Sequence, residues 1–281
     1  MHIIFIAFSY ILIFSSCSKD EATEILPTDK LYVIKDASYG THPLQKMDIY
    51  LPPGRNTTST KTVVFIHGGG WDGGDKEDLI LSNETLERMM EEFPGYALLN
   101  LNYRLVKGTE NQYPAAEEDI AMAMNYFYAN LETYQVSATN YLIGFSAGAH
   151  LAALHTLKHN NQQHTKGCIA FSGAYDFTAA LENESAEARF FVEQFMGGTY
   201  LQKPQAYRAA SPIFHIQQNS SKFFIIHGEN DPLISVNQAK SFAMALNQKS
   251  VLIKTLYHQD AHGISLESLI TLLPQIKEFL K

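Results

Sequence analysis

One stretch, residues 140–153, constrains the fold and function of this chain more than any other. It predicts a short buried strand, a turn of the form G-x-S-x-G around Ser146, and a helix over residues 149–154. A serine at a sharp strand-to-helix turn has a strained backbone, so the residues two before and two after it must be small. Gly144 and Gly148 meet that requirement. Because a five-residue pattern recurs by chance, the interpretation depends on the partners that such a serine needs.

A nucleophilic serine needs a general base, a carboxylate that orients the base, and donors for the developing oxyanion. Candidates for the first two follow later predicted strands. Asp231 comes after the apolar run 222–226, and His262 comes after the run 251–257. The carboxyl ends of parallel strands meet at one edge of a sheet, where sites of this kind lie. The sequence therefore places Ser146, Asp231 and His262 at one edge, in the chain order serine, acid, histidine.

Other titratable residues are alternatives for these two roles. Glu229 lies two residues before Asp231, and Asp176 follows a different predicted strand. The later residue of a turn after a strand usually faces the site, which favours Asp231 over Glu229. His150 and His258 are alternative histidines, for which we expect structural hydrogen bonds.

Alternating segments over the rest of the chain predict an α/β fold. The first two strands alternate in polarity, as in an antiparallel hairpin, whereas later ones are continuous apolar runs, as in a parallel sheet buried on both faces. The predicted strands span residues 31–38, 47–51, 62–66, 97–101, 141–143, 166–171, 222–226 and 251–257. Helices are predicted at 79–93, from Pro114, after Ser146, at 235–246 and at 266–280. We therefore expect a mostly parallel eight-stranded sheet with helices on both faces.

Local signals define some of these helices further. Proline at a first helical position loses no hydrogen bond, so Pro114 is expected to open its helix. Ser235 and Gln238 have the spacing of a capping box. Pro274 is expected to kink the last helix or to begin a second segment. The apolar stripe of the helix after Pro114 consists of Ile120, Ala123, Met124 and Phe127.

Several motifs together resemble one family. In chain order they are H-G-G-G-W (67–71), N-Y-R (102–104), Y-P-A-A (113–116), G-F-S-A-G-A-H (144–150), S-P (211–212), H-G-E-N-D (227–231) and A-H-G (261–263). With these motifs, residues 39–281 resemble an α/β-hydrolase of the carboxylesterase group related to hormone-sensitive lipase. Within that group they are similar to bacterial esterases with a His-Gly-Gly-x-Trp motif, a variant shared with kynurenine formamidases.

The resemblance implies roles for individual residues. The implied nucleophile, orienting acid and general base are Ser146, Asp231 and His262, and the implied oxyanion donors are the backbone amides of Gly69, Gly70 and Ala147. One such donor typically contributes about 3 to 4 kcal/mol to the lowering of the barrier. His67 is expected to order the oxyanion loop rather than to take part in catalysis. Trp71 is either a packing wedge beneath the site or a platform for substrate.

One long segment, residues 177–219, breaks the alternation of strands and helices. Acidic helix formers mix there with aromatic residues, so we expect a few short helices over the carboxyl edge of the sheet. One or two of the aromatic side chains are expected to wall the acyl or alcohol pocket, and the others to pack the insertion onto the sheet. The candidates are Phe190, Phe191, Phe195, Tyr200 and Tyr207. Fixed aromatic walls favour small substrate groups.

The N-terminus indicates export. Residues 3–14 are almost wholly apolar, too short to span a bilayer but as long as the core of a secretory signal. Two serines and Cys17 follow, which resembles a bacterial lipoprotein signal. We expect a signal peptide over 1–16, lipidated Cys17 with a flexible tether over 17–30, and a hydrolase domain over 31–281. The implied location is a bacterial outer membrane; periplasmic or secreted protein and a retained anchor are the alternatives, because no lysine or arginine precedes the apolar run.

Composition excludes some classes of function. The formal net charge of the 281 residues is −8, without a dense basic face, so no nucleic-acid partner is expected. Asp72, Asp75 and Asp78 lack the pattern of a calcium loop, and no other metal motif occurs, so neither metal nor organic cofactor is implied. The second cysteine, Cys168, lies in an apolar run and is expected to be a buried small hydrophobe.

The expected activity is hydrolysis of short-chain or acetyl carboxylic esters through an acyl-enzyme, on a small-molecule or acylated carbohydrate substrate. The insertion over 177–219 is too rich in charge for a broad apolar lid, which disfavours long-chain lipids. Two alternatives come from other classes. One is a serine hydrolase that cleaves amides, such as a formamidase or an exopeptidase, and the other is a non-catalytic binding protein with the hydrolase fold. The oligomeric state does not follow from the sequence.

Overall fold

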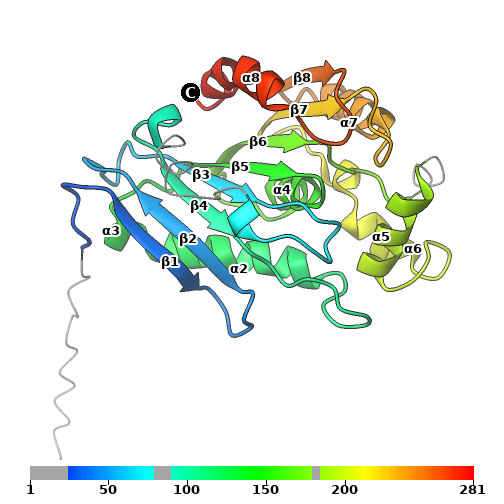
Figure 1. The fold of residues 1–281 in the computed structure, drawn as a ribbon, viewed down its shortest axis with the longest axis horizontal. Helices are drawn as coiled ribbons and strands as arrows, with labels where there is room; N and C mark the ends of the chain where they lie inside the picture. Colours follow the sequence, from blue (N-terminus) through cyan, green and yellow to red (C-terminus); the bar gives the residue numbers. More distant parts are fainter. Residues whose placement is uncertain (1–24, 79–89, 179–183) are drawn as a thin grey trace, which may run out of the picture.

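The computed structural model describes residues 25–78, 90–178 and 184–281. Within them, strands form an eight-stranded sheet in the order β1-β2-β4-β3-β5-β6-β7-β8 (Figure 1). The strands are β1 (Tyr32–Ser38), β2 (Lys46–Leu51), β3 (Thr62–Ile66), β4 (Ala97–Leu101), β5 (Asn140–Phe145), β6 (Thr165–Phe171), β7 (Lys222–Gly228) and β8 (Ile253–His258). β1 pairs antiparallel with β2 and β2 with β4, and the remaining pairs are parallel. The predicted mostly parallel sheet of eight strands is confirmed.

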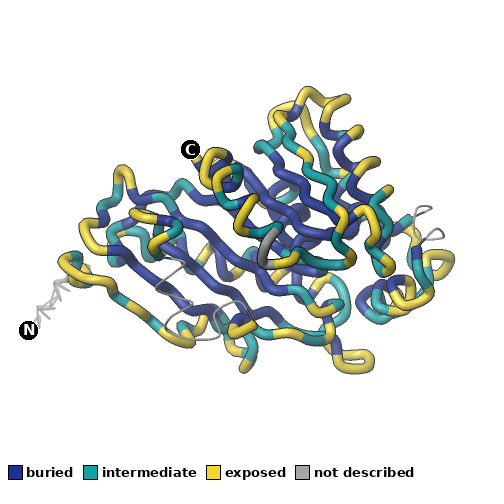
Figure 2. Tube along the Cα trace, turned by 45° about the horizontal axis from the view of Figure 1, so that its top comes forward, coloured by how far each residue is buried: buried dark blue, intermediate teal, exposed yellow. Residues whose placement is uncertain are grey.

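Burial separates the central strands from the edge of the sheet. Every residue of β3 and β4 is buried, and both strands have the predicted bounds. Neighbouring side chains of β3 face opposite sides of the sheet, since Val63 and Val64 belong to different hydrophobic clusters. Edge strand β1 contains only exposed and half-buried residues, and Figure 2 shows its mixed colours against the dark central strands.

Helices cover both faces of the sheet, as predicted. Helices α2, α4 and α7 pack on one face, where Phe127, Leu151 and Phe242 belong to the larger cluster. Helix α8 covers the other face, and Ile276 belongs to the second cluster. The helices are α2 (Ala115–Ala129), α3 (Leu131–Tyr134), α4 (Ala147–Lys158), α5 (Ala186–Met196), α6 (Pro204–Ala210), α7 (Val236–Gln248) and α8 (Leu266–Phe279), with 3-10 turns η1 (Lys76–Asp78) and η3 (Pro212–His215). The predicted helix over 79–93 falls largely outside the described residues.

The turn around Ser146 is shorter than the sequence predicted. The prediction ends the strand before Gly144 and begins the helix at Ala149, whereas β5 continues to Phe145 and α4 begins at Ala147. Ser146 alone connects the two elements. The difference arises because this one residue has φ 54° and ψ −118°, so the chain changes direction in a single step.

Two other local predictions need correction, and a third is narrowed to one of its alternatives. Pro114 immediately precedes the first residue of α2 instead of occupying it. Ser235 does cap α7, but Gln238 forms no reciprocal capping bond, because its Oε1 accepts from the amides of Tyr175 and Asp176 after β6. Helix α8 continues through Pro274, which excludes the start of a second segment and leaves the kink as the prediction.

The insertion forms short helices, as expected. In Figure 1, α5 and α6 lie at the edge toward which the arrowheads of β5 and β6 point, which is the carboxyl edge of the sheet. Phe195 and Tyr207 are fully buried and join the larger hydrophobic cluster. Apolar burial of this size contributes roughly 2 to 3 kcal/mol for each large side chain, so the insertion is an integral part of the domain.

The first described residues are bound to the fold by Arg55. Arg55 is buried, with 4% of the residue exposed. Its guanidinium donates to the carbonyls of Leu26 and Pro27, and its Nε donates to the carbonyl of Tyr134. Cys17 and the expected signal peptide lie outside the described residues. Among the described residues, no helix has both the length and the apolar character to cross a membrane.

Candidate active site

Ser146 occupies a backbone conformation that its glycine neighbours make possible. Its φ of 54° places it in the left-handed region, which is uncommon for a non-glycine residue and frequent at functional sites. A Cβ at Gly144 would lie 2.2 Å from the carbonyl oxygen of Gly148, and a Cβ at Gly148 would lie 2.1 Å from that of Ile66. Any side chain at either position would force α4 away from β5 and β3. The glycines therefore hold Ser146 at the carboxyl edge of the sheet.

His262 connects Ser146 to Asp231. Its Nε2 lies 3.0 Å from Ser146 Oγ, and its Nδ1 lies 2.7 Å from Asp231 Oδ2. A carboxylate oxygen accepts, so Nδ1 carries the hydrogen and Nε2 is free to accept from the serine hydroxyl. The structure thus brings together the three residues that the sequence placed at this edge, from the ends of β5, β7 and β8.

Asp231 is held by several donors. Its side chain has no exposed surface; Oδ1 accepts from the amides of Leu233 and Ile234, and Oδ2 accepts from His262 and lies 3.2 Å from His227 Nε2. Burial is the largest influence and would raise the pKa of this carboxyl, but the hydrogen bonds from His227, His262 and Ile234 outweigh it and hold the pKa well below its ordinary value. Asp231 is therefore ionised across the physiological range.

The alternative acids and histidines have other partners. Glu229 accepts from the amide of Gln259, and Asp176 Oδ1 accepts from the amide and hydroxyl of Thr178. His258 Nδ1 lies 3.4 Å from a carboxylate oxygen of Asp260. His150 donates from Nε2 to the carbonyl of Ala210, 2.7 Å away, and accepts at Nδ1 from Trp71. Neither these acids nor these histidines join Ser146.

The glycine-rich loop after β3 lies beside the serine. A Cβ on Gly68 would be 3.3 Å from the Cβ of Ser146, and the following residues Gly69 and Gly70 have φ of 101° and 59°. Gly70, Ser146 and Ala147 line one cavity, whereas Gly69 does not line it. Ala147 is the first residue of α4, so its amide has no partner within the helix. Gly70 and Ala147 thus lie at the cavity next to Ser146, and the oxyanion roles of Gly69, Gly70 and Ala147 stay predictions.

The cavity next to Ser146 has a volume of about 40 Å³. Its lining is mostly apolar and consists of Gly70, Trp71, Ser146, Ala147, Ala174, Ala188, Phe191, Leu233 and Ile234. Of the five aromatic candidates on the insertion, only Phe191 is among these residues. Phe195 and Tyr207 are buried in packing, while Phe190 and Tyr200 are exposed to 54% and 37%. The expectation that one or two of them reach the pocket agrees with this lining.

A family model described as BD-FAE matches residues 47–246, which is more than half of the 281 residues. The chain belongs to the BD-FAE family. The matched residues include Ser146 and Asp231, whereas His262 lies beyond them.

Several relatives of this BD-FAE protein are named as esterases or formamidases. Esterase LipC of Mycobacterium tuberculosis is 27% identical over 225 residues, covering 75% of this chain and 54% of LipC. A kynurenine formamidase of Meyerozyma guilliermondii is 26% identical over 222 residues, covering 76% of this chain and 80% of that protein. The chain spans about half the length of the first curated relatives that it matches. The resemblance found in the motifs is confirmed.

A solved structure described as a truncated form of carbohydrate esterase from gut microbiota has a TM-score of 0.75 to this chain at 17% identity. The similarity covers 92% of this chain and 99% of that chain. At this identity it shows the fold, and it confirms the α/β-hydrolase architecture.

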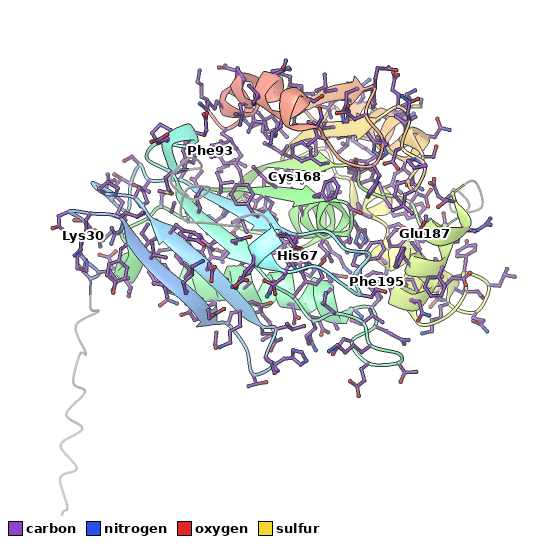
Figure 3. All side chains as sticks on the ribbon, viewed as in Figure 1. Lys30, His67, Phe93, Cys168, Glu187 and Phe195 are labelled. Carbon is purple, nitrogen blue, oxygen red and sulfur yellow. The ribbon has the colours of Figure 1, made fainter. Side chains whose placement is uncertain are left out.

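In this BD-FAE chain, His67 and Trp71 support the loop that carries the glycines. His67 donates from Nδ1 to the carbonyl of Gly68, and its ring stacks on Tyr103 with centroids 4.3 Å apart. Burial lowers the pKa of His67, which favours the neutral ring. Trp71 stacks on Phe195 of α5, and Figure 3 shows His67 and Phe195 on neighbouring parts of this edge. Trp71 is 4% exposed, which favours packing, although its surface also lines the cavity.

Sequence reasoning missed two parts of the site. The first is the contact of His227 with Asp231, although the four-residue spacing within H-G-E-N-D was visible. The second is the loop after β7, whose Leu233 and Ile234 line the cavity. That loop is bound to the insertion: Ser185 Oγ donates to the carbonyl of Leu233, 3.0 Å away, and Glu184 Oε2 accepts from the Ser235 amide at 2.6 Å. Contacts between distant segments of this kind leave no periodic signal in a sequence.

The described parts of the chain contain metal-ligating side chains and one free cysteine. No group of three or more histidine, cysteine, aspartate or glutamate side chains could hold a metal ion there. Asp75 and Asp78 accept hydrogen bonds from nearby backbone amides at the start of η1, as expected for a solvated turn. Cys168 is a free, fully buried thiol, and burial raises its pKa, so it is not a reactive thiolate.

Proposed function

We propose that this protein is a serine esterase that hydrolyses short-chain or acetyl esters through an acyl-enzyme. The observation that supports it is the continuous set of contacts from Asp231 through His262 to Ser146 Oγ, beside a small apolar cavity. A fold by itself would support many activities, so the proposal depends on this site.

The geometry supports a two-step reaction. Ser146 Oγ attacks the ester carbonyl carbon while His262 Nε2 takes the hydroxyl proton, and the amides of Gly70 and Ala147 donate to the oxyanion of the tetrahedral intermediate. The imidazolium then protonates the departing alcohol, which leaves an acyl group on Ser146. Water next attacks that acyl carbonyl and gives a proton to His262, which returns it to Ser146 Oγ as the acid leaves. Asp231 holds the ring and stabilises the imidazolium in both steps.

The size of the cavity supports a short acyl group. The cavity of about 40 Å³ beside Ser146 is small and mostly apolar in its lining. Each methylene that is buried gains about 0.8 kcal/mol, but only where there is room for it. Phe191 and Ile234 form part of its wall, so we expect activity to fall steeply beyond about four carbons.

Acylated carbohydrate is the substrate class that we favour. The support is the structural similarity to a protein described as a carbohydrate esterase, together with the BD-FAE family match. A second candidate activity is amide cleavage, as in a formamidase, which is favoured by the yeast kynurenine formamidase relative and by a cavity that would hold a formyl group.

A substrate panel tests these proposals. Turnover of p-nitrophenyl esters from acetate to octanoate is measured beside release of acetate from acetylated xylan, hydrolysis of N-formylkynurenine and cleavage of an aminoacyl anilide. We expect acetate or propionate to be preferred, with Ser146→Ala as the inactive control. A preference for octanoate would refute the short-acyl proposal. Faster hydrolysis of N-formylkynurenine than of any ester would favour the formamidase, and no turnover of any substrate would favour a binding protein.

We also propose that the protein is exported and anchored by a lipid on Cys17. The sequence pattern of residues 3–17 is the support. Metabolic labelling with a fatty-acid analogue should mark the wild type but not Cys17→Ser, and the variant should leave the membrane fraction. Unlabelled wild-type protein in the medium or periplasm would favour simple secretion.

A further inference from the structure

A second histidine contacts the carboxylate of the candidate triad. His227 lies near the end of β7 and has no exposed surface. Its Nε2 is 3.2 Å from Asp231 Oδ2 and 2.9 Å from the carbonyl oxygen of Ile234. Both neighbours are acceptors, so Nε2 carries the hydrogen; it is donated to the carbonyl of Ile234, and this N–H lies within ion-pair distance of Asp231 Oδ2.

The other ring nitrogen of His227 has no hydrogen-bond partner. Nδ1 is buried, and no donor or acceptor among the described residues contacts it. An unsatisfied buried nitrogen destabilises a fold, whereas an apolar side chain of similar size would fill the space without that cost. The useful feature of a histidine at this position is therefore its Nε2–H donor.

The donors around Asp231 are divided between its two oxygens. Oδ1 accepts from the amides of Leu233 and Ile234, both at 2.9 Å, so the backbone of the loop holds the position of this oxygen. Oδ2 faces His262 on one side and His227 on the other. Among the described residues, His262 would be the only side-chain donor left on Oδ2 without His227, and Oδ2 would then have no second side chain to fix its direction.

We propose that His227 is a positioning residue, which fixes Asp231 Oδ2 so that this oxygen orients His262 for proton transfer with Ser146. The inference rests on the proposed serine-hydrolase mechanism and assigns a part of it to a residue outside the triad. His227 acts through Asp231 and touches no reacting atom. The bond from His227 Nε2 to the carbonyl of Ile234 also connects this histidine, next to the carboxylate of Asp231, to the loop whose residues line the cavity.

A matched pair of variants tests the donor. His227→Gln keeps an N–H that reaches about as far as Nε2, and His227→Met has nearly the same shape without any donor. We expect His227→Met to lower kcat by about 10- to 100-fold with KM within twofold of wild type, because a small misplacement of a catalytic group costs up to about 100-fold. His227→Gln should recover most of that loss. Thermal unfolding of both variants measures the structural contribution separately.

A double-mutant cycle tests the route through Asp231. In the Asp231→Asn background, His227→Met should change kcat by no more than about twofold, because the carboxylate that His227 positions is absent. An equal loss in both backgrounds would overturn the proposal. So would a glutamine variant as impaired as the methionine variant. If His227→Met does not fold, His227→Asn, whose amide is too short to reach Oδ2, replaces it in the comparison with glutamine.

Labelling of Ser146 by a p-nitrophenyl phosphonate separates this proposal from the proposed ester activity. The labelling rate reports the nucleophilicity of Ser146 without requiring the right substrate. A slower rate in His227→Met, recovered in His227→Gln, supports the positioning role even if no ester is turned over. A rate that is the same in all three proteins overturns it even if ester turnover is found.

Discussion

Two buried carboxylates among the described residues contact histidines, and only one of these pairs lies beside the candidate nucleophile Ser146. Asp231 accepts from His262 at the carboxyl edge of the sheet. Glu117 on α2 lies 2.6 Å from His159 Nε2 and 2.7 Å from Lys158 Nζ at the far end of α4. Burial, the largest influence, would raise the pKa of each carboxyl, but donated hydrogen bonds outweigh it; the pKa of Glu117 falls from 4.5 to about 2.

The two sites differ in what lies beyond the carboxylate. His262 turns its second nitrogen to Ser146 Oγ, next to a cavity. His159 uses Nε2 for Glu117, and its ring stacks on that of His155. A histidine–carboxylate pair is therefore a general way to stabilise buried charge, and a strained serine and a cavity are what make one of them a candidate catalytic site.

The largest expected effect comes from removing the nucleophile. Ser146→Ala should lower ester turnover by at least several thousandfold, because no hydroxyl remains to form the acyl-enzyme. The fold should be retained, as circular dichroism and thermal unfolding can show. Activity at one-tenth of the wild-type level would show that Ser146 is not the nucleophile.

Neutralising the orienting acid should have the next largest effect. Asp231→Asn should lower kcat by about a thousandfold or more, since the amide no longer selects the right histidine tautomer. Glu229→Gln is the matched control and should stay within about twofold of wild type, because Glu229 is bonded to Gln259 instead of His262. The reverse order of effects would transfer the orienting role to Glu229.

The apolar cavity beside Ser146 is the second feature that distinguishes the pair of Asp231 and His262; the pocket at Lys158, the partner of Glu117, has a mostly polar lining and no nucleophile of this kind was predicted there. Phe191→Ala should raise the rate on hexanoate relative to butyrate by about tenfold, because room for two more methylenes gains about 1.6 kcal/mol. Phe190→Ala is the control: that ring is 54% exposed and packs against Phe191 without lining the cavity. If the dependence of the rate on acyl chain length is the same in Phe191→Ala as in the wild type, the insertion does not determine substrate size.

The smallest effect on turnover is expected at the other carboxylate. Glu117→Gln should leave kcat within about twofold while lowering the free energy of unfolding by about 1 to 3 kcal/mol. The folded pKa of about 2 is below the unfolded value near 4.5, so the stabilisation by Glu117 is full above pH 4.5 and is lost as pH falls toward 2. Unfolding measured between pH 6 and 2 should therefore show a flatter profile for the variant. A large loss of activity at constant stability would contradict the structural role of Glu117.

The sequence predicted most of the fold because the central strands are apolar on both faces. The bounds of β3 and β4 agree with the prediction, since mostly apolar runs of this length are typical of strands that are buried on both faces. The triad was also predictable, because chain order and strand ends place its members at one edge. The length of the turn at Ser146 was not, since one residue with positive φ replaces a longer loop.

Side-chain direction accounts for most of what was missed. Gln238 has the spacing of a capping residue, yet it bonds the chain after β6, which is distant in sequence. Phe190 and Phe191 are adjacent aromatics, and only the rotation of α5 against Gly70 decides which one reaches the cavity. His227 precedes a glycine at a strand end, and its contact with Asp231 depends on the turn that follows.

The bonds from Glu184 and Ser185 to the loop over 233–235 bear on how such enzymes could diversify or be engineered. Because the start of α5 and the loop after Asp231 support each other, the insertion is not an independent module. The loop supplies only backbone atoms to these bonds, so a chimaera that receives residues 184–196 from a homologue keeps them only where that homologue has an acceptor at position 184 and a hydroxyl at position 185. We expect insertions from homologues that keep these two side chains to be accepted most readily, because they leave the loop after Asp231 held in place while the cavity wall changes.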